Sequence, residues 1–235
     1  MSTTVPSERD RTVIGLSMLS FAAGSMDGIA FLALSGVFSS ALSGNTVLMA
    51  LAIGQGHFAV ALNVVFSILG YVAGVSAATV LFAKFGQGSA WALVFEAVAL
   101  AAFAALWLAF GTTPQNVVLQ GLILLSSVGM GLQGGIGQEV GFPGIKTVIF
   151  TGTYTTIASN FTKRALNGDR PLFTPLAMRQ ISALAAYAGG ALIVGVFAAA
   201  HWLRIAPFLP LAAVLAALAG LGLRVVRLER GSPQA

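Results

Sequence analysis

Asp27 is the residue whose type and position most favour chemistry in this sequence. It lies inside the first long apolar segment, within Gly24-Ser25-Met26-Asp27-Gly28. In a membrane-spanning segment, a carboxylate at that depth is costly unless it is paired, protonated or hydrated. The flanking glycines weaken the helix, and unwound backbone would place carbonyl groups beside the carboxylate. We interpret Asp27 as a candidate proton or cation site. The structural alternative is a helix-capping or interhelical hydrogen bond.

A second polar motif, Ser43-Gly44-Asn45-Thr46, interrupts the next apolar segment. It supplies two hydroxyl groups, an amide and a flexible glycine within about one helical turn. In an apolar setting these groups need partners, so they would line a polar cavity or end a broken helix that faces an anion. The alternative is that the small residues only pack helices closely.

The second half of the chain has a comparable motif, Thr151-Gly152-Thr153. Thr153, Thr156 and Asn160 are spaced as i, i+3 and i+7, so they share one helix face. A polar stripe on a membrane helix faces protein or water rather than lipid. We therefore expect this face to contribute to a buried polar site.

Two further polar side chains lie within apolar segments. Gln133 belongs to a glycine-dense stretch, residues 129–135, which we interpret as the counterpart of the Asp27 region. Glu96 lies well inside the fourth apolar segment and has no polar neighbour in the sequence. It needs a partner from another helix, and it ranks below Asp27 as a site for an ion.

The sequence offers little material for catalysis. It contains no cysteine, and its two histidines, His57 and His201, lie far apart near segment ends. No phosphate-binding loop, zinc-protease motif or nucleophile elbow is found in the sequence. We therefore predict no enzyme activity, no catalytic residue, no metal site and no cofactor.

The composition is that of an integral membrane protein. Of 235 residues, 57% are hydrophobic and 8% are charged, with a mean hydropathy of +0.91. A soluble domain has about 25% charged residues. This excludes a soluble enzyme domain and a disordered chain. The sequence pI is about 10.3, but the cations fall at the ends of apolar runs rather than on one exposed face, which excludes a nucleic-acid partner.

The elements that must position these residues are eight apolar segments, each near the ~20 residues that a membrane helix needs. We predict an all-α, polytopic helical membrane protein with six to eight transmembrane segments and short polar tails at 1–11 and 230–235. The first segment continues past Asp27, which favours a membrane helix over a cleaved signal peptide. The segments are 12–36, 37–55, 58–84, 89–111, 114–140, 145–167, 178–203 and 206–229.

The positive-inside rule leaves two topologies open. If all eight segments cross, nine Lys and Arg residues lie on the cytoplasmic side and three outside. If the second and sixth segments instead enter and leave on one side, the ratio becomes eleven to one. Those two segments carry the glycine motifs, although the sixth is long enough to cross. Both topologies place the N- and C-termini in the cytoplasm.

The two halves of the chain, 12–111 and 112–229, resemble each other. Gly44 and Gly152 lie 108 residues apart, and the Tyr71-Val72-Ala73-Gly74 and Tyr187-Ala188-Gly189-Gly190 motifs lie 116 apart. The difference is about the size of an insertion at 167–174. We predict an internal duplication of a four-segment unit, as in many transporters. The alternative is that glycine-rich helices align by chance.

The motifs around Asp27, Ser43–Thr46, Gln133 and Thr151–Thr153 together resemble the YoaK-like bacterial inner-membrane proteins, a domain-of-unknown-function family. The resemblance covers about residues 12–228. The chain departs from the family pattern at Ser43, usually Thr, and at Gly134-Gly135, more often Asn-Ala. The resemblance implies a multi-pass inner-membrane protein and supplies no activity.

Two functions of different classes follow from these residues. In the first, the protein is a small-solute or ion transporter in the lipid bilayer, with proton coupling among the options. Asp27 would bind the proton or cation, and the solute site would be lined by Asn45, Thr46, Gln133, Thr151 and Thr153. In the second, it is a membrane scaffold whose small-residue motifs only pack helices. A hydrated cavity near mid-membrane, bounded by both glycine motifs, would favour the transporter. Dry, close helix contacts at those motifs would favour the scaffold.

The duplication also makes a spatial prediction. If the halves are related by a pseudo-twofold axis, Asp27 and Gln133 should be symmetry mates. Ser43–Thr46 should then face Thr151–Thr153, because neither break can be satisfied by lipid. Oligomeric state, substrate and coupling ion are not determined by these patterns.

Overall fold

The computed structural model describes residues 8–85, 88–139 and 151–222, and within these ranges every regular element is a helix. Lys146, Arg224, Arg227, Arg230 and both ends of the chain lie outside the described residues. The helices are α1 (Glu8–Ala33), α2 (Leu42–Gly54), α3 (Phe58–Lys84), α4 (Gly88–Phe110), α5 (Asn116–Glu139), α6 (Thr151–Leu166), α7 (Pro175–Ala199), the 3₁₀ turn η1 (Leu203–Ile205), α8 (Phe208–Ala217) and the π-helical turn η2 (Leu218–Gly222).

Six helical segments of the described chain are long and apolar enough to cross a membrane. They belong to α1, α3, α4, α5, α7 and the η1–α8–η2 segment. The other two helices are short: α2 has 13 residues, and the described α6 has 16. At 1.5 Å per residue, α2 reaches only about 20 Å, well short of the ~30 Å hydrocarbon core. The chain is therefore an all-α polytopic membrane protein with six candidate spans, as the second topology requires.

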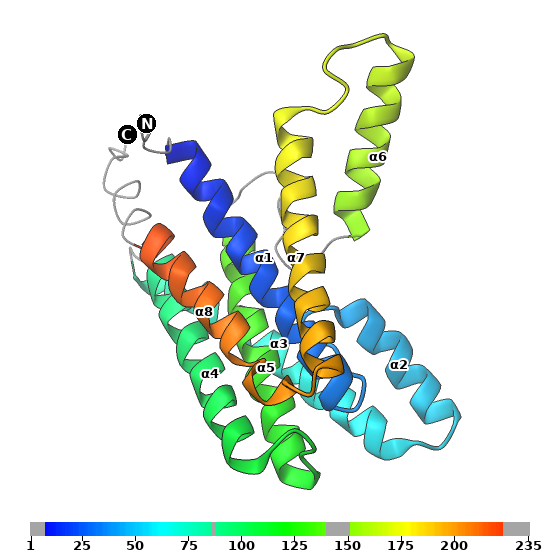
Figure 1. Ribbon diagram of the computed structural model, residues 1–235, viewed down its shortest axis with the longest axis vertical. Helices are drawn as coiled ribbons and strands as arrows, with labels where there is room; N and C mark the ends of the chain where they lie inside the picture. Colours follow the sequence, from blue (N-terminus) through cyan, green and yellow to red (C-terminus); the bar gives the residue numbers. More distant parts are fainter. Residues whose placement is uncertain (1–7, 86–87, 140–150, 223–235) are drawn as a thin grey trace.

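The six spans form one bundle (Figure 1). The most extensive helix pairs are α1 with α7 and α3 with α5, and α4 and α8 flank them against α5 and α1. The largest fully buried side chains come from α1, α4 and α5, among them Trp107, Phe103 and Met26. Residues far apart in the sequence thus meet in the centre of the bundle.

Glycine makes the two main helix pairs possible. A Cβ at Gly24 of α1 would collide with the backbone carbonyl of Tyr187 in α7. At Gly74 of α3, a Cβ would collide with the carbonyl of Val128 in α5. Lipid supplies no hydrophobic driving force between helices, so such close backbone packing is a main source of association in a bilayer.

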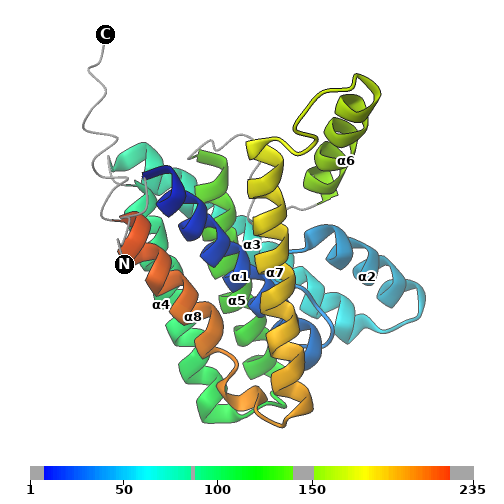
Figure 2. The same cartoon turned by 45° about the horizontal axis from the view of Figure 1, so that its top comes forward.

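The two short helices lie on the same side of the bundle. Figure 2 shows α2 and α6 outside the packed spans, with α2 against α3 and α6 beside α7. The side chains of α6 are mostly exposed, and Thr153 is its one buried residue. The polar stripe predicted for this helix is therefore only partly covered, since Thr156 is exposed and Asn160 is half-buried.

Candidate functional site

The chain reverses direction between α1 and α2. Residues 34–41 leave the end of α1 and turn back along it, so that the Ser39 amide meets the side chain of Asp27. Asp27 lies six residues before the end of α1, which is about 9 Å along the helix axis. The connection thus re-enters the bundle, and α2 begins at about the depth of the Asp27 carboxylate.

Four hydrogen bonds surround the Asp27 carboxylate. Oδ1 accepts from the backbone N–H groups of Ser39 at 2.7 Å and Ser40 at 2.8 Å. Oδ2 accepts from the hydroxyl groups of Ser40 and Tyr187, both at 2.6 Å. The residue is only 3% exposed. We refer to Asp27, Ser39, Ser40 and Tyr187 as the Asp27 cluster; it joins α1, the chain reversal and α7 through one carboxylate.

Asn45 closes the same reversal from the first turn of α2. Its Nδ2 donates to the Phe38 carbonyl at 2.6 Å, and its Oδ1 accepts from the Phe38 N–H at 2.8 Å. The amide also donates to Ser67 of α3 at 2.9 Å. A glutamine would be too long to make both backbone bonds, so a short amide at this position matches the local geometry.

A row of serine hydroxyls extends the network to α5. Ser67 hydrogen-bonds with Ser127 at 2.9 Å and also donates to the Phe38 carbonyl at 2.7 Å. Ser39 donates to Ser126 at 2.9 Å. Because lipid offers these groups no hydrogen-bond partner, their mutual bonds hold the reversal against α3 and α5.

The first turn of α6 lies at the end of that helix nearest α2 (Figures 1 and 2). Helix α6 contacts α7, which carries Tyr187 of the Asp27 cluster. Thr153, in this first turn, is the one buried residue of α6.

Several of the other predicted residues of the two glycine motifs do not line this network. Ser43 and Thr46 are exposed, and the Thr46 hydroxyl donates to the Leu42 carbonyl of its own helix. Gly44 lies against the ring of Phe38, whereas Gly152 has open space around it. Thr151 is also exposed, and Thr156 donates to the Gly152 carbonyl within α6. These exposed side chains lie outside the network, whereas Thr153 of the second motif is buried.

Gln133 and Glu96 lie apart from the Asp27 cluster. The Gln133 amide donates to the Leu19 carbonyl at 2.9 Å and joins α5 to α1, while its carbonyl oxygen has no hydrogen-bond partner among the described residues. Glu96 is completely buried on α4, and neither carboxylate oxygen has a partner in the same described ranges. The partner on another helix that the sequence requires for Glu96 is thus missing among the described residues.

Several members of the network have only weak signals in the sequence. Ser39 and Ser40 are separated from the Ser43–Thr46 motif by two residues, so their position beside a polar break is a local signal. Tyr187 stands out in the sequence only as part of the repeated Tyr-Gly pattern, and nothing local indicates that it contacts Asp27, 160 residues away. Within the described ranges, no three His, Asp or Glu side chains gather as a metal site would require.

Comparison with known proteins gives a family match and a sequence relative. The model of a family described as a protein of unknown function (DUF1275) matches residues 15–221. The chain is also 31% identical over 186 residues to the UPF0700 transmembrane protein YoaK of Bacillus subtilis (strain 168), a match that covers 76% of this chain and 80% of that protein. No solved structure matches.

Proposed function

The chain belongs to the DUF1275 family, and since the function of that family is unknown, we propose from the geometry of its site that it is a transporter for a small solute or ion. The observation that carries the proposal is a buried carboxylate on a spanning helix that binds a chain reversal inside the bundle. Transporters commonly place their sites at such discontinuous helices near mid-membrane. We place the protein in the bacterial inner membrane with both termini in the cytoplasm.

We further propose that the two halves are inverted repeats. The close glycine contacts support this, because they occur in matched pairs at constant spacing. Gly24 meets the backbone of Tyr187, and 107 residues after Gly24, Gly131 meets the backbone of Tyr71. Tyr71 and Tyr187 are 116 residues apart. A chance alignment of glycine-rich helices would not reproduce such contacts in space.

Two more glycine contacts have the same spacing. Gly190 meets the backbone of Phe21, as Gly74 meets that of Val128. The partners, Phe21 on α1 and Val128 on α5, are again 107 residues apart. The glycines, Gly74 on α3 and Gly190 on α7, are 116 residues apart. The counterpart helices run in opposite directions in Figure 1, with three candidate spans in each half. An odd number of spans per repeat gives inverted topology, the arrangement of many secondary transporters.

With the 107-residue spacing between α1 and α5, Asp27 corresponds to Gly134, one residue beyond Gln133. The Tyr71 hydroxyl lies against Gly134, as the Tyr187 hydroxyl lies against Asp27. The second half would therefore lack the carboxylate of the first. We propose that one half carries the ion-dependent switch and that the other half follows it passively.

The proposed switch is a change of charge at Asp27. A proton on Oδ2 would make that oxygen a donor, so the Ser40 or the Tyr187 hydroxyl would have to reverse its bond and accept from it. The bonds would then be made by a neutral carboxyl group and would be weaker, which would loosen either the chain reversal or the contact between α1 and α7. A bound cation would compete for the same lone pairs. The buried Glu96, which has no partner among the described residues, is a second candidate carrier for a proton.

A membrane scaffold is the second candidate function. It is favoured by the direct backbone contacts at Gly24 and Gly74, which leave no space for water between the paired helices. The apolar pocket between α1, α7 and α8 and the pocket beside Arg204 do not include Asp27, Asn45 or Gln133. In a scaffold, the Asp27 cluster would only stabilise the fold.

Flux measurements on proteoliposomes separate these functions. A panel of radiolabelled ions and small metabolites should identify at least one that the wild-type protein transports, and Asp27→Asn should reduce its flux at least tenfold. Thr79→Val is the matched control, because Thr79 is exposed and its hydroxyl contacts only its own helix. Equal flux in Asp27→Asn and wild type would remove Asp27 from the mechanism, and no flux of any solute would favour the scaffold.

A further inference from the structure

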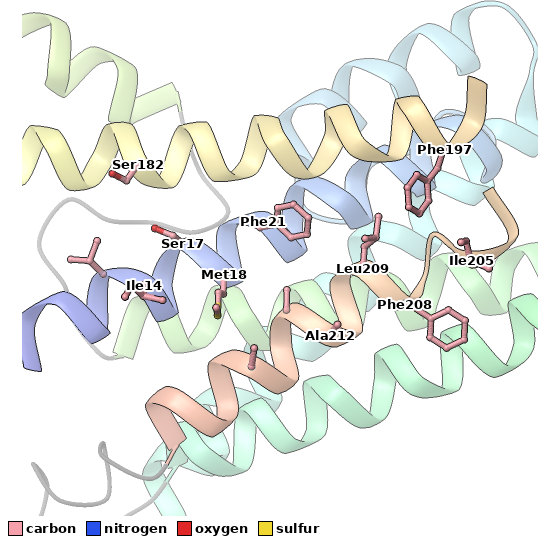
Figure 3. Close-up of a pocket in the computed structure, with 13 residues that line it drawn as sticks. Ile14, Ser17, Met18, Phe21, Ser182, Phe197, Ile205, Phe208, Leu209 and Ala212 are labelled. Carbon is pink, nitrogen blue, oxygen red and sulfur yellow. The ribbon is translucent and has the colours of Figure 1, made fainter. Parts of the chain in front are cut away.

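A large apolar groove lies outside the polar network, between α1, α7 and α8. Its volume is about 970 Å³. Figure 3 shows its walls: Phe21 and Met18 from α1, Phe197 from α7, and Leu209 and Ala212 from α8. None of the lining residues belongs to the Asp27 cluster. The groove is therefore a separate feature of the molecule.

The groove arises because α7 and α8 diverge. They are joined through η1, where α7 contacts the chain that leads into α8, and then separate along their lengths (Figure 1). Helix α1 packs against both and forms the floor. Ala212, Ala213 and Ala216 widen the space on the α8 side, because they are small. All three helices belong to candidate membrane spans, so the groove faces the hydrocarbon region.

One end of the groove is polar. The hydroxyls of Ser17 and Ser182 lie at this end, whereas Ile205, Phe208 and Phe197 lie at the other (Figure 3). Arg179 is one helical turn before Ser182, and its spacing to Ser182 and Phe197 places it on the same face of α7. It is half-buried and has no hydrogen bond or ion pair with any described residue.

We propose that this groove binds an acyl chain of an anionic phospholipid, with the phosphate of the headgroup at Arg179 and the Ser17 hydroxyl; the Ser182 hydroxyl donates to the Met178 carbonyl of its own helix. The apolar walls match an acyl chain, and the Arg179 guanidinium, which has no partner among the described residues, matches a phosphate, for which arginine is well suited. The polar end lies toward the first turn of α7, as expected for a headgroup at the membrane surface. The inference does not depend on transport.

Native mass spectrometry of the purified protein tests the proposal with two defined probes, phosphatidylglycerol and phosphatidylcholine of identical acyl chains. The wild type should retain one phosphatidylglycerol in preference to phosphatidylcholine, by at least tenfold. Ala212→Trp would fill the groove and should abolish retention of both lipids. Leu192→Trp is the matched control, since Leu192 is exposed on α7 and does not line the groove.

Arg179→Gln tests the headgroup separately and leaves the groove intact. It should remove the preference for phosphatidylglycerol while the affinity for phosphatidylcholine stays the same. An unchanged preference in Arg179→Gln, or equal lipid retention in Ala212→Trp and Leu192→Trp, would overturn the proposal. So would a wild-type dimer that Ala212→Trp converts to a monomer, because a second copy would then occupy the groove.

Discussion

At the scale of single residues, Asp27 shows how one side chain organises a membrane protein. Its carboxylate accepts from two backbone amides and two hydroxyls, which belong to the chain reversal and to α7. Each of these donors would otherwise be unsatisfied in an apolar environment, and each buried donor left without a partner costs about 1–3 kcal/mol. The cluster is thus a structural requirement of the reversal, whatever else it does.

The contribution of Tyr187 to this cluster can be measured. Tyr187→Phe removes one hydrogen bond to the Asp27 carboxyl group and leaves the ring in place, so we expect a loss of about 1–3 kcal/mol in the free energy of unfolding. Tyr154→Phe is the control: that side chain is 62% exposed, and its substitution should change stability by less than about 0.5 kcal/mol. Urea unfolding in mild detergent, followed by tryptophan fluorescence, compares the two. Equal losses would show that the Tyr187 hydroxyl adds nothing specific.

Glu96 leads to the opposite expectation. Its carboxyl group is fully buried without a partner among the described residues, so Glu96→Leu removes an unsatisfied polar group and should raise the thermal unfolding midpoint. Glu96→Gln keeps a polar group of the same size and should bring little or no gain. A thermal-shift measurement on detergent-solubilised protein distinguishes the three forms. If Glu96→Leu lowers the midpoint, Glu96 has a partner that this conformation does not display.

At the scale of helices, the fold depends on where glycine allows two backbones to touch. Gly24 and Gly189 offer a matched comparison. A Cβ at Gly24 would collide with the Tyr187 backbone in α7, whereas Gly189, two residues further along α7, has open space around it. The same substitution should therefore have opposite effects at the two positions.

Gly24→Ala should separate α1 from α7 and lower the free energy of unfolding by about 1–3 kcal/mol or more, since backbone cannot give way as a side chain does. Gly189→Ala should be neutral or stabilise the protein by up to about 1 kcal/mol, because alanine favours helix more than glycine does. Steric-trap or urea unfolding of both variants in the same detergent provides the measurement. A harmless Gly24→Ala would contradict the close packing of α1 and α7.

At the scale of the whole molecule, the six-span arrangement predicts which connections share a side of the membrane. The chain has no cysteine, so in each single-cysteine variant the introduced residue is the one thiol that a maleimide can label. Thr113→Cys, between α4 and α5, should be labelled from the same side as Trp202→Cys, between α7 and η1, and from the side opposite Asn167→Cys. All three residues are exposed. Membrane-impermeant maleimide on intact cells and on inverted vesicles gives the assignment.

The eight-crossing alternative makes a different prediction for the same experiment. It places Thr113 on the side of Asn167, whereas Trp202 and Asn167 remain on opposite sides in both arrangements and serve as references. Gln55→Cys, between α2 and α3, provides an independent reading, because it should share the side of Trp202 only if α2 does not cross. Labelling of Thr113 with Asn167 would refute six crossings.

The sequence by itself determined the class of the molecule and the positions of its helices. Hydropathy and helix length are local properties, so eight apolar segments and a family resemblance were sufficient to predict an all-α polytopic membrane protein. The buried carboxylate and the polar breaks were also visible, because Asp27, Asn45 and Glu96 lie among apolar neighbours. The cost of such groups in a bilayer follows from their chemistry and their depth in the apolar segment alone.

Only the tertiary structure decided which groups meet. Asp27 contacts a reversal 12 residues away and a tyrosine 160 residues away, and Gln133 bonds to Leu19 rather than to the Asp27 cluster. It also showed that α2 has only 13 residues and that Glu96 has no partner among the described residues. The physical reason is that composition fixes the cost of each buried polar group, whereas its partner depends on the register in which glycines allow distant helices to pack.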